Sequence, residues 1–247
     1  MNKEKWLSIQ LGKPELDDAI KDLLSLSYEL TAVKKRNLKS LAKNPGDSAN
    51  YLFYSQSQLI ERKEIIMKIE KFVKLMTGHF DNKEQFTEMK EAGKIFPYAE
   101  HVNTVCNDKI KNIPEDFNGI FVVEESYYET DGKRHASPHL FLITDSNAGV
   151  ILSSYEIPAG EDKNTFSYSS MKSVDYSELR KSEKFTPAIY KENNGSWEGG
   201  SVSQFTPVMI FRLWERFSET CLEVSESMEV NGKRTFGYDV PIIYKRV

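Results

Sequence analysis

One short segment of the chain gathers acids, phenols and cations: EESYY at residues 124–128, followed by TDGKRH at residues 130–135. Its composition is typical of a β-strand, in which alternate side chains share a face. Glu124, Ser126 and Tyr128 would then face one way, and Glu125 and Tyr127 the other. Paired carboxylates on an enclosed face could act as general acid and base. Because acids near a turn are common, the pattern equally fits cross-strand pairs and solvated charges on an ordinary sheet.

Other catalytic signatures are absent from the sequence. It has no GxGxxG, Walker, GxSxG or HExxH motif, which disfavours the familiar nucleotide-binding and hydrolytic chemistries. Cys106 and Cys221 form no CxxC pair, so we expect free thiols packed in β-like stretches rather than zinc ligands. Only His135 and His139 lie close in sequence. Pro138 between them indicates a turn-like segment, which disfavours a helical metal site.

Composition limits the classes of partner. The 247 residues carry 33 basic and 37 acidic side chains, a formal charge of -4. This balance disfavours general binding to nucleic acid or to a membrane surface. Hydrophobic residues at 39% and aromatic residues at 12% suffice for a folded core. No apolar run reaches the roughly 18–20 residues that a membrane span needs, and no secretory signal opens the chain, so we expect a cytoplasmic protein.

The first third of the chain has helical periodicity. A helix is expected over residues 15–43, followed by a turn at Asn-Pro-Gly-Asp, residues 44–47. A second amphipathic helix is expected over residues 52–76, ending before Gly78, with an apolar stripe at Leu52, Leu59, Ile66, Ile69, Val73 and Met76. Together they predict an N-terminal helical hairpin in an extension over residues 1–75.

One further helix is expected over residues 83–91, with an N-cap from Asp81-Asn82. The sequence after this helix is typical of β-strands. Asn231-Gly232 is the strongest hairpin signal, and residues 145–149 form a second hairpin loop. In the Ser- and Lys-rich region 161–200, only Tyr190 and Trp197 are assigned, as strand-borne anchors. Short strands joined by tight turns predict an antiparallel barrel or sandwich. The expected strands are residues 101–106, 120–123, 140–143, 150–157, 208–211, 222–230 and 234–244.

Four sequence motifs carry a resemblance to a known family. The decapeptide MTGHFDNKEQ resembles the opening signature of the CpcT/CpeT family, the T-type chromophore lyases of phycobiliproteins. Three further motifs follow in the family's order, and the likeness extends over residues 72–247. The four motifs are MTGHFDNKEQ at residues 76–85, VVEE at 122–125, YEIP at 155–158 and NGKRTFG at 231–237.

The resemblance implies a calycin-like antiparallel β-barrel over residues 76–247, mainly β, preceded by the helical hairpin. It implies a barrel that binds an open-chain tetrapyrrole, phycocyanobilin or phycoerythrobilin, as substrate and requires no other cofactor. Such a protein helps to join the bilin, through a thioether, to a cysteine of a phycobiliprotein subunit. The acceptor thiol belongs to that partner, so neither Cys106 nor Cys221 need be catalytic. The sequence leaves a homodimer open.

The resemblance also suggests site residues. Glu124 and Glu125 would be pyrrole partners or proton donors. Aromatic contacts with the chromophore would come from Tyr127, Tyr128 and Tyr155, and cations for its propionates from Arg134 and His139. The chain departs from the family where an Arg-Gln-Arg motif is usual: by register the two arginines fall on Ser137 and His139. Losing a bidentate arginine weakens carboxylate binding.

Two other classes of function fit the same sequence. One is a non-catalytic calycin-like protein that binds a tetrapyrrole or another amphipathic small molecule. The other is an interaction module in which the helical hairpin binds a partner protein and the barrel supports it. Fold transfers between relatives more safely than function does, so the three hypotheses stay open at this point.

Overall fold

The computed structural model describes residues 60, 63–130 and 132–247. The chain divides into two compact units, residues 1–60 and 61–247. The helix and turn expected over residues 15–47 lie outside the described residues. Of the helix expected over residues 52–76, the part from 63 to 76 is present. It belongs to the same compact unit as the strands that follow it.

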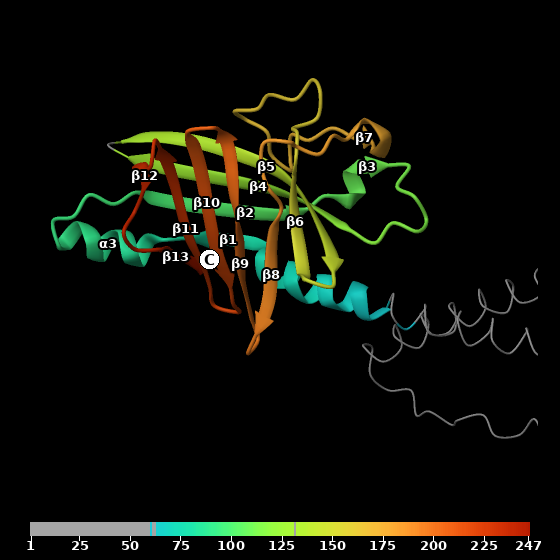
Figure 1. Ribbon diagram of the computed structural model, residues 1–247, viewed down its shortest axis with the longest axis horizontal. Coiled ribbons are helices and arrows are strands. Elements are labelled where there is room, and N and C mark those ends of the chain that lie inside the picture. The colour runs from blue at the N-terminus through green and yellow to red at the C-terminus, as the bar shows by residue number, and fades with distance from the viewer. Residues whose placement is uncertain (1–59, 61–62, 131) are drawn as a thin grey trace, which may run out of the picture. The chain divides into compact units, whose positions relative to one another are not determined.

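The described part of the chain is mainly β, as predicted (Figure 1). After the helix of residues 63–76, the elements in chain order are β1 (Gly78–Asp81), α3 (Lys83–Glu91), β2 (Tyr98–Val105), η1 (Asn107–Lys109), β3 (Ile110–Lys111), β4 (Ile120–Thr130), β5 (Lys133–Ser146), β6 (Gly149–Tyr155), β7 (Val174–Asp175), η2 (Tyr176–Glu178), β8 (Ala188–Asn193), β9 (Ser196–Thr206), β10 (Met209–Phe217), β11 (Cys221–Val230), β12 (Lys233–Gly237) and β13 (Ile242–Arg246).

Ten of these strands close into an antiparallel barrel. Their order around the barrel is β10-β9-β8-β6-β5-β4-β2-β1-β13-β11. The ring closes because β11 also pairs with β10 along its whole length. The first half of β11 pairs with β13 and the second half with β12, while β3 and β7 form a small parallel pair outside the barrel. Of the two architectures that the sequence left open, the barrel is therefore confirmed, and its closure removes the exposed edges of an open sheet.

Each predicted strand overlaps an observed one, but β4, β5 and β10 are much longer than expected, and two segments were assigned wrongly. The segment expected to be turn-like at residues 135–139 is part of β5, with Glu124 opposite His139 and Tyr128 opposite His135. Pro138 fits there because β5 pairs with β6 only from Leu140 onward, so one edge of β5 is unpaired.

The strand expected over residues 234–244 is in fact two strands, β12 and β13. Residues 238–241 separate them, and this connection ends on Pro241, which has no N–H to donate to a ladder. The turn before β12 is as predicted: Asn231 and Gly232 both have positive φ, 51° and 72°, the conformation of a tight two-residue hairpin.

Helix α3 has the predicted bounds, and Asn82 is its N-cap residue. The Asn82 side chain makes no capping bond, however. Its amide group donates to the Pro97 carbonyl and accepts from the Ala99 N–H, which ties the start of β2 to the helix. Among the residues that the structure describes, no helix combines the length and the apolar character that crossing a membrane requires.

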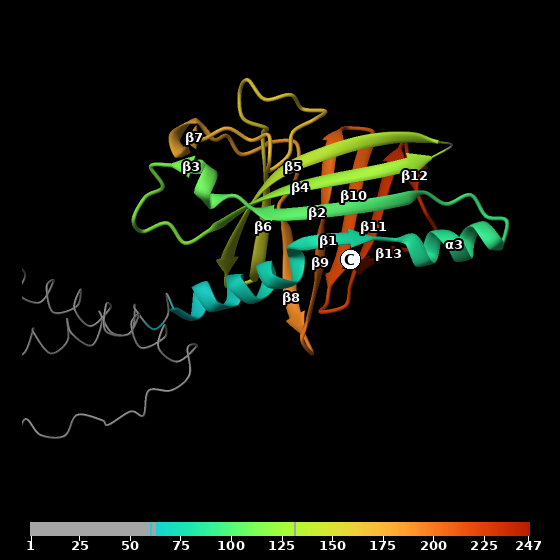
Figure 2. The same ribbon diagram turned by 180° about the vertical axis from the view of Figure 1, so that it is seen from behind.

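The helix of residues 63–76 lies across one end of the barrel (Figure 2). Ile69, Phe72, Val73 and Met76 recur at helical spacing and join the main core cluster. The Phe72 ring lies 5.0–5.6 Å from the rings of Tyr190, Trp197 and Phe217 on three barrel strands. The predicted stripe was thus right at its C-terminal end but misplaced Ile66, which is 38% exposed.

The end of this helix is fixed by the last strand. The Arg246 guanidinium donates to the carbonyls of Thr77 and Leu75 and lies over the Phe80 ring. Gly78 makes room for it: φ there is +127°, and a Cβ would lie 2.2 Å from Arg246 Nη1. Helix terminus, first strand and last strand therefore meet at one glycine.

We expect Gly78→Ala to lower the free energy of unfolding by about 1–3 kcal/mol, because the alanine meets both an unfavourable φ and the Arg246 side chain. Urea unfolding followed by circular dichroism measures this. Gly93→Ala is the matched control, since Gly93 also has a positive φ but open space around its Cα. Equal losses in the two variants would show that the contact with Arg246 adds nothing.

Candidate functional site

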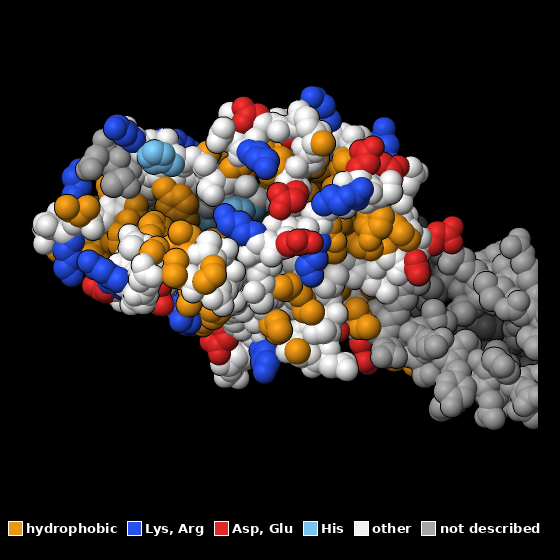
Figure 3. Space-filling view, turned by 45° about the horizontal axis from the view of Figure 1, so that its top comes forward, with side chains coloured by type: hydrophobic (Ala, Val, Ile, Leu, Met, Phe, Trp, Pro, Cys, Tyr) orange, Lys and Arg blue, Asp and Glu red, His pale blue; other side chains and the backbone are white. Residues whose placement is uncertain are grey.

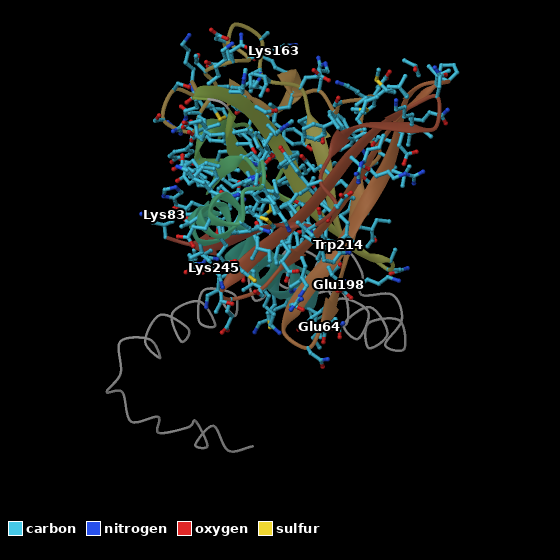
Figure 4. All side chains as sticks on the ribbon, turned by 90° about the vertical axis from the view of Figure 1, so that its left-hand side faces the viewer. Glu64, Lys83, Lys163, Glu198, Trp214 and Lys245 are labelled. Carbon is cyan, nitrogen blue, oxygen red and sulfur yellow. The ribbon has the colours of Figure 1, made fainter. Side chains whose placement is uncertain are left out.

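The barrel encloses a cavity of about 320 Å³. Its wall consists of side chains from eight strands of the ring, from β12 and from the loop before β8; the eight strands are β2, β4, β5, β6, β8, β9, β10 and β11. Alternation along β10 is an example: Leu213 and Glu215 line the cavity, whereas Trp214 between them is 37% exposed on the outer side (Figure 4). Figure 3 shows a hollow in the surface with hydrophobic side chains on its walls and a histidine and a basic side chain beside it.

A buried ion pair lies in the cavity wall. His101 Nδ1 lies 3.2 Å from Glu124 Oε2, and both residues are less than 10% exposed. Burial disfavours the charged form of both groups, but the attraction between the two opposite charges outweighs this cost. The pKa of His101 is therefore raised and the pKa of Glu124 is lowered. The charged pair is therefore the stable form at neutral pH. Ser126 Oγ also contacts the imidazole, at 3.2 Å from Nε2.

Two buried tyrosines lie between this pair and a second acid, Glu226. His101 Nε2 lies 3.2 Å from the Tyr244 hydroxyl, and Tyr128 interacts with both Tyr244 and Glu226. Burial raises the pKa of Glu226, and it raises the pKa of both tyrosines well above 10. The tyrosines thus remain neutral donors over the physiological range.

A third acid, Glu215, is 7% exposed and accepts a hydrogen bond from the Tyr190 hydroxyl. Burial, reinforced by the Glu124 carboxylate, raises the pKa of Glu215 to about 8. At neutral pH this carboxyl group keeps its proton. The cavity therefore holds the ionised Glu124, paired with His101, and a neutral carboxylic acid at Glu215 that can donate a hydrogen bond or a proton.

The mouth of the cavity is aromatic. The Phe185 ring lies 5.2 Å from that of Phe205 and 6.0 Å from that of Phe211. His139 stacks on Phe141 at 5.5 Å and meets Phe185 edge-on at 6.3 Å. These five rings form the aromatic mouth. A flat conjugated molecule could stack there on its way into the barrel.

The structure brings together only some of the residues predicted from sequence. Glu124, Tyr128 and His139 line the cavity, as alternation along β4 and its pairing with β5 require. The other set of the EESYY segment, Glu125 and Tyr127, faces outward. Glu125 accepts hydrogen bonds from the Tyr127 hydroxyl and from a backbone N–H of the loop outside the barrel.

Arg134 and Tyr155 also lie outside the cavity. Arg134 stacks on the Tyr127 ring at 4.3 Å and pairs with Glu100 at 2.8 Å on the outer surface. Tyr155 packs against Phe121 at 5.4 Å, in a second hydrophobic cluster that covers the outer face of β4. Arg134 lies opposite Glu129 in the ladder between β4 and β5, one residue along from the inward-facing Tyr128, so it faces outward. Neither side chain lines the cavity.

Four ionisable residues of the cavity were not predicted: His101, Lys184, Glu215 and Glu226. His101 could have been found, because it lies in an expected strand and alternates inward with Asn103. The two glutamates lie on β10 and β11, each two residues after an apolar residue and therefore on the same strand face as that residue. Glu215 follows Leu213, and Glu226 follows Val224. Polar residues on the apolar face of a strand are the signal that identifies them.

Within residues 63–130 and 132–247, no group of three or more His, Cys, Asp or Glu side chains is arranged to hold a metal ion. Cys106 is a buried free thiol and Cys221 a partly buried one. No protein-family model, no curated protein and no solved structure matches this chain. The CpcT/CpeT family therefore stays a prediction that rests on the four sequence motifs.

Proposed function

We propose that this barrel is a calycin-like binding protein for an open-chain tetrapyrrole, a bilin. The observation that carries the proposal is the closed barrel with a cavity that is aromatic at its mouth and acidic inside. Conjugated rings need aromatic walls, and pyrrole N–H groups need acceptors. Glu124 and Glu226 are suitable acceptors, and Tyr128 is a neutral wall residue.

The size of the cavity bears on the fit. About 320 Å³ is at the lower end of the roughly 300–1,000 Å³ typical of pockets for drug-sized ligands. We propose that the ring system occupies the cavity and that the polar substituents of the bilin extend through the aromatic mouth. A molecule of this class would then replace water along the whole inner wall.

A second candidate function is bilin attachment, and one observation favours it. Glu215 holds a proton at neutral pH inside the cavity, where it could act as a general acid. In that reaction the thiol of a phycobiliprotein subunit adds across the ethylidene double bond: a C–S bond forms, and the neighbouring ring carbon takes a proton. This chain would then be a lyase with a phycobiliprotein subunit as partner. Cytoplasmic location and a homodimer are predictions that belong to the same hypothesis.

Titration of the purified protein with phycocyanobilin tests the binding function. We expect saturable changes in visible absorbance and an induced circular dichroism signal, because a chiral pocket fixes the twist of the pigment. Phycoerythrobilin serves as the second probe. If neither bilin gives a saturable change, the binding function is wrong.

Transfer is tested by adding an apo-phycobiliprotein subunit and looking for a coloured covalent band after denaturing electrophoresis. If Glu215 is the acid, Glu215→Gln should bind the bilin but slow its transfer by about 10²-fold or more, the typical contribution of a positioned acid. If the unmodified chain binds the bilin but transfers none of it, the lyase function is wrong and only the binding function remains. Equal transfer rates would remove Glu215 from the mechanism.

A further inference from the structure

The cavity is electrically asymmetric. Its three glutamates, Glu124, Glu215 and Glu226, come from three strands of the wall. Among the described residues that line it, Lys184 is the one lysine or arginine, in the loop before β8. Burial lowers the pKa of His139, so this ring adds no charge at the mouth at neutral pH. One positive group thus lies at the mouth and the acids lie along the wall.

Among the residues that the structure describes, none is an anionic partner of Lys184. None of the ion pairs found among the described residues includes it. Its Nζ lies instead over two rings of the aromatic mouth, 4.5 Å from the centroid of Phe205 and 5.3 Å from that of Phe185. Cation–π contacts hold the ammonium group over the rings while leaving its three donors free for another acceptor.

We propose that Lys184 binds an anionic end group of the ligand, a carboxylate or sulfonate, and so fixes the direction in which a flat aromatic ligand lies in the barrel. The anionic end lies at the aromatic mouth beside Lys184, the flat ring system lies inside the cavity, and the end rich in hydrogen-bond donors points to the glutamates. A carboxylate or sulfonate pointing inward would find no unpaired cation in the described part of the wall, because His101 is already paired with Glu124 at 3.2 Å, and this disfavours the reverse orientation. This inference deepens the proposed function, since it rests on the same cavity taking a ligand.

A pair of fluorescent probes tests the inference without any bilin. 8-Anilinonaphthalene-1-sulfonate carries the anion, and N-phenyl-1-naphthylamine has the same rings without it. Lys184→Gln should weaken binding of the sulfonate about tenfold or more, the loss expected for a charge-assisted contact, and leave the neutral probe unchanged. Lys184→Arg keeps the charge and should restore most of the affinity.

Lys181→Gln is the matched control, an exposed lysine of the same loop that does not line the cavity. Equal losses in the Lys181 and Lys184 variants would assign the effect to the general surface charge and overturn the proposal. It would also fail if Lys184→Gln weakened both probes equally, or if the unmodified protein bound the sulfonate without saturation. Probe results as expected, together with no spectral change for either bilin, would uphold the anion site while rejecting the bilin as its ligand.

Discussion

Replacing Phe72 by alanine is expected to lower the free energy of unfolding by about 3–5 kcal/mol, the usual cost of removing a fully buried aromatic ring. Phe72 is 0% exposed and contacts Tyr190, Trp197 and Phe217. Its ring joins the helix of residues 63–76 to the barrel, so the truncation leaves a void where three strands and the helix meet.

Chemical denaturation followed by far-ultraviolet circular dichroism measures this loss. Met67→Ala on the same helix is the control, because Met67 is 44% exposed and should cost little. A loss below about 1 kcal/mol for Phe72→Ala would contradict the packing of this helix against the barrel.

The second large effect is a dependence of stability on pH that Glu215→Gln should remove. In the folded protein Glu215 keeps its proton up to about pH 8, whereas in the unfolded chain it releases the proton near its ordinary pKa of 4.5. The stability that this group contributes is therefore fully present below pH 4.5 and is lost as pH rises to about 8. Each unit of pKa difference corresponds to about 1.4 kcal/mol, so the loss is on the order of 5 kcal/mol.

Glutamine mimics the protonated acid and can accept the Tyr190 hydrogen bond, but it cannot release a proton. We expect the variant and the unmodified protein to be equally stable near pH 4.5, and the variant to be the more stable one above pH 8. Denaturation curves across this range measure the difference. Glu192→Gln, at an exposed position of β8, should leave the pH profile unchanged. Parallel profiles for the Glu215 variant and the unmodified protein would mean that Glu215 is ionised in the fold.

Much of the fold could be predicted because it depends on local signals. α3 is bounded by a turn-forming Asn82 and by Gly93, and the hairpin at Asn231-Gly232 needs only a two-residue turn. Strand positions followed from runs of β-branched and aromatic residues. The closure of β11 onto β10 depends instead on contacts throughout the ring, which no short stretch of sequence specifies.

The same distinction explains which site residues could be predicted. Glu124 and Tyr128 need only the alternation of one strand, and that reasoning was sufficient. Alternation alone does not say which face of a strand lines the barrel, so Glu125 and Tyr127 were also predicted as site residues although they face outward. Lys184 lies in a loop with no periodicity, and only the closed barrel places its side chain at the mouth.

In the proposed function the ligand lies inside the barrel. The affinity of two neighbouring variants for phycocyanobilin tests this location. Ser201 lines the cavity, whereas Val202, the next residue of β9, is 52% exposed on the outside. Ser201→Phe fills part of the cavity and should weaken binding tenfold or more, while Val202→Phe should leave the affinity unchanged, with circular dichroism verifying that both variants fold. Equal affinities in the two folded variants would contradict the account, because the pigment would then bind elsewhere.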